Sequence, residues 1–235
     1  MVAKSFRKLL AVGALASLSS IAFATPVMPG DVVEVGNRAG SAFTPTPIAG
    51  DSNGLKRNVT FLLDGQISKR VTAGMFVLDQ RDATPGGSSW EQFYSFCLQP
   101  DVWLMPFSNP YTAKSTAASG YNLALDELWG RNFASVASDV TAAAFQVAVW
   151  ELAYDGDRSL STGSFQLQSG GAVNQLASQW LSALDGTGPM GNVAILVNNP
   201  NMTDRQDLIT ASVPEPSSMA LVLLGLGGLL ARRKS

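Results

Sequence analysis

Residues 142–155 read AAAFQVAVWELAYD and place apolar side chains on every face that a helix would present. A helix with this pattern is normally buried. Asp139, or the serine before it, can cap the first turn, and Gly156 can end the helix in the left-handed conformation. Gln146 and Glu151 are polar positions in its interior. Because a buried glutamine needs partners for both its amide hydrogens and its carbonyl, we expect another element to supply them.

The rest of the chain alternates between strand-like and helix-like patterns. Period-two or short continuous apolar runs predict strands, and spacings of three and four predict helices. The expected strands lie at residues 59–63, 71–78, 91–98, 165–167 and 193–197, and the further helices at 122–133 and 172–184. Strands followed by helices favour an α+β fold. We expect the strands of the N-terminal half to pack on a small helical subdomain with the buried helix at its centre.

Segments rich in Gly, Pro, Ser and Asn separate these elements. Residues 25–57 predict an irregular leader and residues 103–120 a mixed loop. Asp64-Gly65 is a turn signal between the first two strands. The expected division of the chain is 1–24, 25–57, 58–212 and 213–235, with the α+β domain in the third part.

The N-terminal residues have the organisation of a secretory signal. Lys4, Arg7 and Lys8 precede an apolar run that ends in Ala22-Phe23-Ala24. A basic start, a short apolar run and a small-residue site are typical of a signal peptide, here cleaved after Ala24. An uncleaved membrane anchor is the alternative, and export follows from either.

The C-terminal residues combine three features. Pro214-Glu215-Pro216 precede an apolar run at 217–231, and Arg232-Arg233-Lys234 follow it. A helix over 218–231 spans roughly 21 Å at ~1.5 Å per residue. This is short of the ~30 Å hydrocarbon core, so we expect a sorting signal more than a permanent anchor. The basic end is expected to stay cytoplasmic, with the acidic body outside.

Composition narrows the possible chemistry. The chain has 235 residues and 46% hydrophobic positions, enough for one domain with a sizeable core. It contains no histidine, which removes Ser–His–Asp and Cys–His catalysis and most zinc sites. We therefore expect no enzyme, no metal and no cofactor. An acidic body also argues against nucleic acid as a partner. The single cysteine, Cys97, cannot form an internal disulfide and is either an intermolecular partner or a reactive group.

The tail resembles the PEP-CTERM sorting signal. The resemblance rests on Pro214, Glu215 and Pro216, the short apolar run, and Arg232 and Arg233. It implies a Gram-negative bacterium, passage through the inner membrane, and an exosortase as the processing partner. Proteins with this tail tend to accompany exopolysaccharide and biofilm matrix.

The body resembles the thioester domains of bacterial surface adhesins over residues 59–208. The matching motifs are Phe96-Cys97-Leu98 and, on the central helix, Gln146 with Ala148 and Trp150. The family's threonine before the glutamine is a phenylalanine here. A third match is the segment Ala73-Gly74-Met75-Phe76. The resemblance implies a thioester between Cys97 and Gln146, with Phe96 and Trp150 as shielding residues.

A thioester requires these two residue types. The cysteine sulfur attacks the glutamine carbonyl, ammonia leaves, and burial protects the bond from hydrolysis. The bond would then acylate an amine or hydroxyl of a polymer or protein surface. The alternative is a structural matrix protein with a reduced, inert Cys97, since a free cysteine is often a small core residue. A thiol enzyme is the third possibility, which the lack of histidine disfavours.

Overall fold

The computed structural model describes residues 27–36, 55–65, 68–84, 89–102, 104, 109–198 and 205–212. The expected signal residues Ala22 and Ala24 lie outside the described residues. The same holds for the expected C-terminal helix at 218–231 and for the motif residues of the tail, which are Pro214, Glu215, Pro216, Arg232 and Arg233. Within the described part of the chain, no helix is both long and apolar enough to cross a membrane.

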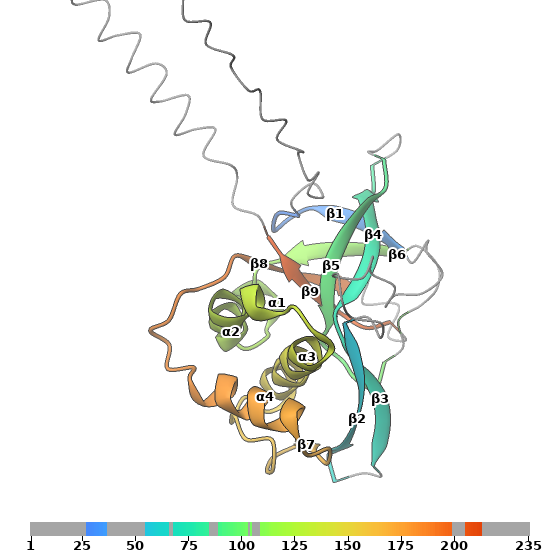
Figure 1. The fold of residues 1–235 in the computed structure, drawn as a ribbon. Helices are drawn as coiled ribbons and strands as arrows, with labels where there is room; N and C mark the ends of the chain where they lie inside the picture. Colours follow the sequence, from blue (N-terminus) through green and yellow to red (C-terminus); the bar gives the residue numbers. More distant parts are fainter. Residues whose placement is uncertain are drawn as a thin grey trace, which may run out of the picture.

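Six antiparallel strands close into a barrel (Figure 1). In order around it they are β1 (Val32–Gly36), β4 (Phe76–Asp82), β5 (Glu91–Cys97), β9 (Leu208–Ala211), β8 (Val193–Asn198) and β6 (Asn109–Lys114). Pairing of β1 with β6 closes the ring. Closure leaves no unpaired edge along the ring, which protects the strands from pairing with other chains.

A second sheet of three strands lies beside the helices (Figure 1). Its order is β3 (Lys69–Gly74), β2 (Lys56–Leu63) and β7 (Phe165–Leu167). The turn expected at Asp64-Gly65 is confirmed, and both residues adopt positive φ, at 52° and 66°. The expected strand at 71–78 is instead two strands in two sheets. It breaks at Gly74, whose backbone lies against Leu55 so closely that a Cβ would overlap the Leu55 carbonyl oxygen.

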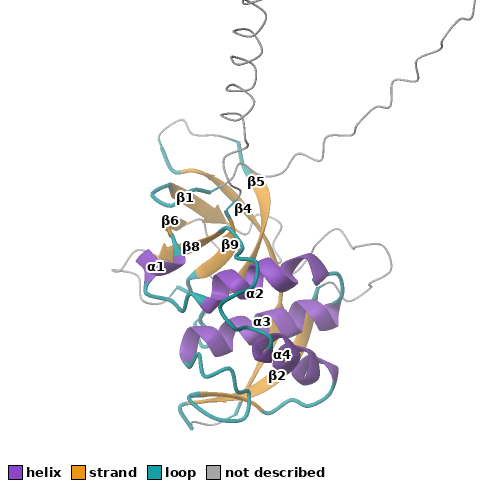
Figure 2. Cartoon of the chain, turned by 90° about the vertical axis from the view of Figure 1, so that its left-hand side faces the viewer, coloured by secondary structure: helices purple, strands orange, loops and turns teal. Residues whose placement is uncertain are grey.

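The predicted central helix is confirmed as α3 (Asp139–Tyr154), which lies among the other helices (Figure 2). Ser138 caps it by accepting a hydrogen bond from the backbone N–H of Thr141, at 3.2 Å. Eleven consecutive residues of α3, 142–152, are buried. Its neighbours are α2 (Ala124–Asn132) and α4 (Ala172–Ser182), and the shorter α1 (Thr116–Ser119) and the 3₁₀ turn η1 (Phe133–Ser135) complete the helical part.

The expected mixture of helix and strand is confirmed, but its distribution along the chain is wrong in three places. The leader at 25–57 contains β1, the loop at 103–120 contains β6 and α1, and β9 follows the last expected strand. The barrel therefore draws on both halves of the chain rather than on the N-terminal half alone. These strands are short and interrupted by Gly, Pro or polar residues, and partners distant in sequence stabilise them.

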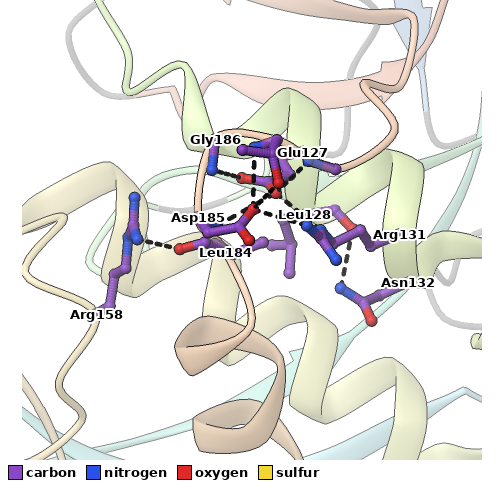
Figure 3. Close-up of polar contacts among 10 residues, drawn as sticks. Glu127, Leu128, Arg131, Asn132, Arg158, Leu184, Asp185 and Gly186 are labelled. Carbon is purple, nitrogen blue, oxygen red and sulfur yellow. Dashed lines mark hydrogen bonds and ion pairs between the residues drawn. The ribbon is translucent and has the colours of Figure 1, made fainter.

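A buried carboxylate anchors the loop after α4 (Figure 3). Glu127 of α2 is 1% exposed and accepts backbone N–H groups of Asp185, Gly186 and Gly188. It also forms an ion pair with Arg131, at 2.8 Å. These hydrogen bonds outweigh the effect of burial and lower the pKa of Glu127. Glu127 therefore holds the 184–188 loop against α2 as an ionised group.

Candidate functional site

The side-chain amide of Gln146 lies against the backbone of Cys97. Its Oε1 accepts from the Cys97 N–H at 2.9 Å, and its Nε2 donates to the Cys97 carbonyl oxygen at 2.7 Å. Both bonds are buried, and Gln146 itself is 1% exposed. Cys97, 49 residues earlier in the chain, is thus the partner of Gln146, as expected. Both contacts are made by the main chain of Cys97.

The course of the strands explains why the N–H and C=O of Cys97 have no strand partner on the β4 side. The ladder between β4 and β5 ends at the pair Phe76 and Ser95, because the chain before Phe76 turns away at Gly74. On the other side of β5, the next main-chain bond runs from the Leu98 N–H to Asp207 O. The Cys97 N–H and C=O face the gap that β4 leaves. The Gln146 amide fills that gap and satisfies both groups.

The sulfur of Cys97 is buried as a protonated thiol. Cys97 is 4% exposed, and its Sγ donates to the Gln99 carbonyl oxygen at 3.1 Å. Burial raises the pKa of the thiol to about 12, and the nearby charges of Asp101 and Asp207 add to this rise. A thiol with such a pKa stays protonated near neutral pH and is not the thiolate nucleophile that thiol enzymes use.

The two expected shielding residues occupy different places. Trp150, one helical turn after Gln146, packs against Phe61 and Phe165, with ring centroids 5.8 and 6.1 Å away. Its indole N–H has no hydrogen bond of ordinary geometry, and its interaction with the Cys97 sulfur opposes the rise in the thiol pKa. Trp150 therefore lies beside the sulfur.

Phe96 points away from the side chain of Cys97, since successive residues of a strand alternate between faces. It enters an aromatic cluster, with its ring 4.7 Å from that of Phe145 and 6.0 Å from that of Trp129. This places Phe96 in the core that holds α2 and α3 on β5. Its expected role as a shield of the sulfur is better described as support for the strand.

Two tyrosine–aspartate pairs surround the buried thiol and were not singled out from the sequence. The Tyr154 hydroxyl donates to Asp101 Oδ1 at 2.6 Å, and the Tyr121 hydroxyl donates to Asp207 Oδ2 at 3.0 Å. Burial, together with these carboxylates, raises the pKa of both tyrosines. No local motif joins these residues, because they come from four separate segments. The spacing of Gln146, Trp150 and Tyr154 by four residues is the signal that could have placed Tyr154 on the face of Gln146.

Comparison with known proteins bears on the tail of the chain. Residues 212–234 match the family model for the PEP-CTERM protein-sorting motif. No curated protein and no solved structure matches the chain. The motif implies an exported protein that is sorted to the cell envelope or the extracellular space, and it is consistent with processing by an exosortase. The resemblance of the body to thioester domains receives no support from these comparisons and stays a hypothesis.

Proposed function

We propose that this exported envelope or matrix protein forms an internal thioester between Cys97 and Gln146 and uses it to bind a surface covalently. The observation that carries the proposal is the pair of hydrogen bonds that hold the Gln146 amide on the Cys97 backbone. They hold the Gln146 carbonyl against the main chain of Cys97, which is the only cysteine of the chain. Positioning of two reacting groups in this way replaces much of the entropy cost of the reaction.

The same contacts suit the bond-forming step. The Cys97 Sγ attacks the Cδ of Gln146, and the thiol proton passes to Nε2, which leaves as ammonia. Negative charge on Oε1 in the tetrahedral intermediate is stabilised by the Cys97 N–H, which already donates to this oxygen at 2.9 Å. A neutral thiol is suited to the step because it carries the proton that the departing nitrogen needs.

The acylation step returns the cysteine to its thiol form. An amine or hydroxyl of the target attacks Cδ, the bond between Cδ and Sγ breaks, and the proton of the nucleophile passes to the sulfur. The target is then joined to Gln146 through an amide or ester. Burial of Cys97 and the neighbouring indole of Trp150 protect the bond from water until a target arrives.

A structural role for the same residues is the second candidate. Both the oxygen and the nitrogen of the Gln146 amide are hydrogen-bonded to the Cys97 main chain, and the Cys97 thiol donates to the Gln99 carbonyl oxygen. A matrix protein with an inert cysteine needs no more than this, because the glutamine completes the strand ladder. The sorting tail is compatible with either candidate.

Covalent capture of methylamine separates the two candidates. We expect the purified full-length protein to incorporate methylamine at Gln146, identified in the peptide that contains this residue, with appearance of a free thiol at Cys97. The Cys97→Ala variant is the matched control and should capture none while keeping its fold. Absence of capture under denaturing conditions, which expose every thioester, would leave only the structural role.

A further inference from the structure

The chain that follows β5 forms a turn directly over the Cys97 sulfur. The Gln99 carbonyl oxygen accepts from the Cys97 thiol at 3.1 Å and from the Val102 N–H at 3.3 Å. Residues 99–102 thus form a closed turn, and the carbonyl of its first residue, Gln99, lies on the sulfur. Any molecule that reaches the sulfur from this side must displace the turn.

Two hydrogen bonds hold this turn in place from opposite sides. On the barrel side, Gln99 Oε1 accepts from the Asp207 N–H at 2.7 Å. On the helix side, Asp101 accepts from the Tyr154 hydroxyl at 2.6 Å. The first contact is part-buried and continues the contact between β5 and β9, whereas the second is exposed to solvent. The helix side is therefore the side on which the turn opens with less disruption.

Helix α3 supplies both the reacting carbonyl of Gln146 and the Tyr154 hydroxyl that bonds to the turn. Gln146, Trp150 and Tyr154 follow one another at intervals of four residues on one face. The chain from Cys97 to Asp101 runs along that face, bonded to Gln146 at its start and to Tyr154 at its end. Trp150 lies between these two contacts, beside the sulfur.

We propose that the Asp101–Tyr154 hydrogen bond gates access to the Cys97–Gln146 site, with both residues acting as positioning residues. The inference rests on the proposed function for its purpose, since the gate decides when water or a target amine meets the thioester. While the bond is intact, the turn covers the sulfur. When it breaks, residues 99–102 swing away from α3, and the nucleophile reaches Cδ of Gln146 from that side.

The single cysteine makes the gate measurable, because opening of the thioester releases the one thiol of the chain. We compare thiol release by methylamine in the wild type, Tyr154→Phe and Asp101→Ala. Loss of one exposed hydrogen bond predicts a rate increase of roughly two- to tenfold in both variants. Asp101→Asn keeps an acceptor for the tyrosine hydroxyl and should restore the slow rate. Tyr94→Phe, on the exposed face of β5, is the control and should behave as wild type.

The outcomes distinguish the gate from the thioester itself. If the wild type captures methylamine but Tyr154→Phe and Asp101→Ala release thiol at the wild-type rate, the gate is refuted and the thioester stands. If the wild type contains no thioester, alkylation of the free Cys97 thiol by iodoacetamide measures the same gate. Faster alkylation in both variants, reversed in Asp101→Asn, would then support the gate without the proposed function, and equal rates would overturn it.

Discussion

Replacing Glu151 by Gln is expected to stabilise the protein at alkaline pH, although Glu151 is buried in the last turn of the core helix α3. The residue is 0% exposed. Its Oε1 accepts from the N–H groups of Arg158 and Ser159, at 2.9 and 3.3 Å. Its Oε2 is buried and receives no hydrogen bond. The neighbouring acid is the exposed Asp157. Protonated Glu151 donates a hydrogen bond to the carboxylate of Asp157.

The pKa of Glu151 sets the size and direction of the effect. Burial raises it from 4.5 to about 8, assisted by the hydrogen bond to Asp157 and by the charges of Asp157 and Asp155. Between these two values the unfolded chain has lost a proton that the folded protein keeps. The free energy of unfolding therefore falls as pH rises from 4.5 to about 8, and this penalty persists at higher pH. Allowing for screening by solvent around Asp157, we expect a loss on the order of 1–3 kcal/mol.

A glutamine at this position avoids the penalty. Its carbonyl oxygen can accept from the two backbone N–H groups, and its NH₂ can donate to Asp157 at every pH. Urea unfolding at pH 6 and pH 9 should show that Glu151→Gln loses less stability than the wild type between these values, by about 1–2 kcal/mol. The advantage of the variant should be smaller at pH 6 and should vanish below about pH 4.5, where Glu151 is protonated in both the folded and the unfolded protein.

Glu127→Gln is the matched control because Glu127 is also a buried glutamate that binds a loop. Its carboxylate is stabilised as an ion by backbone N–H groups and Arg131, and its pKa is lowered. The substitution should cost about 1–3 kcal/mol at both pH values. If Glu151→Gln destabilises the protein equally at pH 6 and pH 9, as expected of Glu127→Gln, the assignment of a proton to Glu151 is wrong.

Three further substitutions test the packing around the site. Gln146→Leu should cost roughly 2–5 kcal/mol in urea unfolding because it leaves the Cys97 N–H and C=O without partners, and a near-neutral result would show that the amide is dispensable. Trp150→Ala should cost about 3–5 kcal/mol by the same assay, since it opens a cavity between α3 and the small sheet. Gly74→Ala should cost about 1–3 kcal/mol through overlap with Leu55, whereas Gly170→Ala, where a Cβ meets open space, should be neutral. Equal stability of the two alanine variants would contradict the close approach at Gly74.

The central helix was predictable because its signal is local. An apolar pattern on all faces has few explanations besides burial, and the capping residues lie next to it in the sequence. The meeting of Gln146 with the cysteine strand was expected from the need to satisfy a buried amide together with a family resemblance. The detailed contact was not, since the amide meets the Cys97 backbone in a gap that exists only because β4 begins at Phe76 and the chain before it belongs to the other sheet.

The parts of the fold that were missed depend on partners distant in sequence. Strand β1 has five residues and is stabilised by β4 and β6, which pair with it from about 45 and 80 positions further along the chain. The hydrogen bond between Asp101 and Tyr154 connects a turn to the end of a helix 53 positions away in the sequence. Neither has a pattern of its own, because single tyrosines and aspartates occur on most protein surfaces. Such features become visible only once the barrel is closed.

The mass of the intact body tests the central claim most directly. A protein with the Cys97–Gln146 thioester is lighter by one ammonia than the mass calculated from its processed sequence, and Cys97→Ala has the calculated mass of its own sequence. We expect this deficit in the wild type, together with its loss after treatment with methylamine as one methylamine is added. A wild-type body at its calculated mass, with a thiol at Cys97 that titrates fully after unfolding, would contradict the thioester.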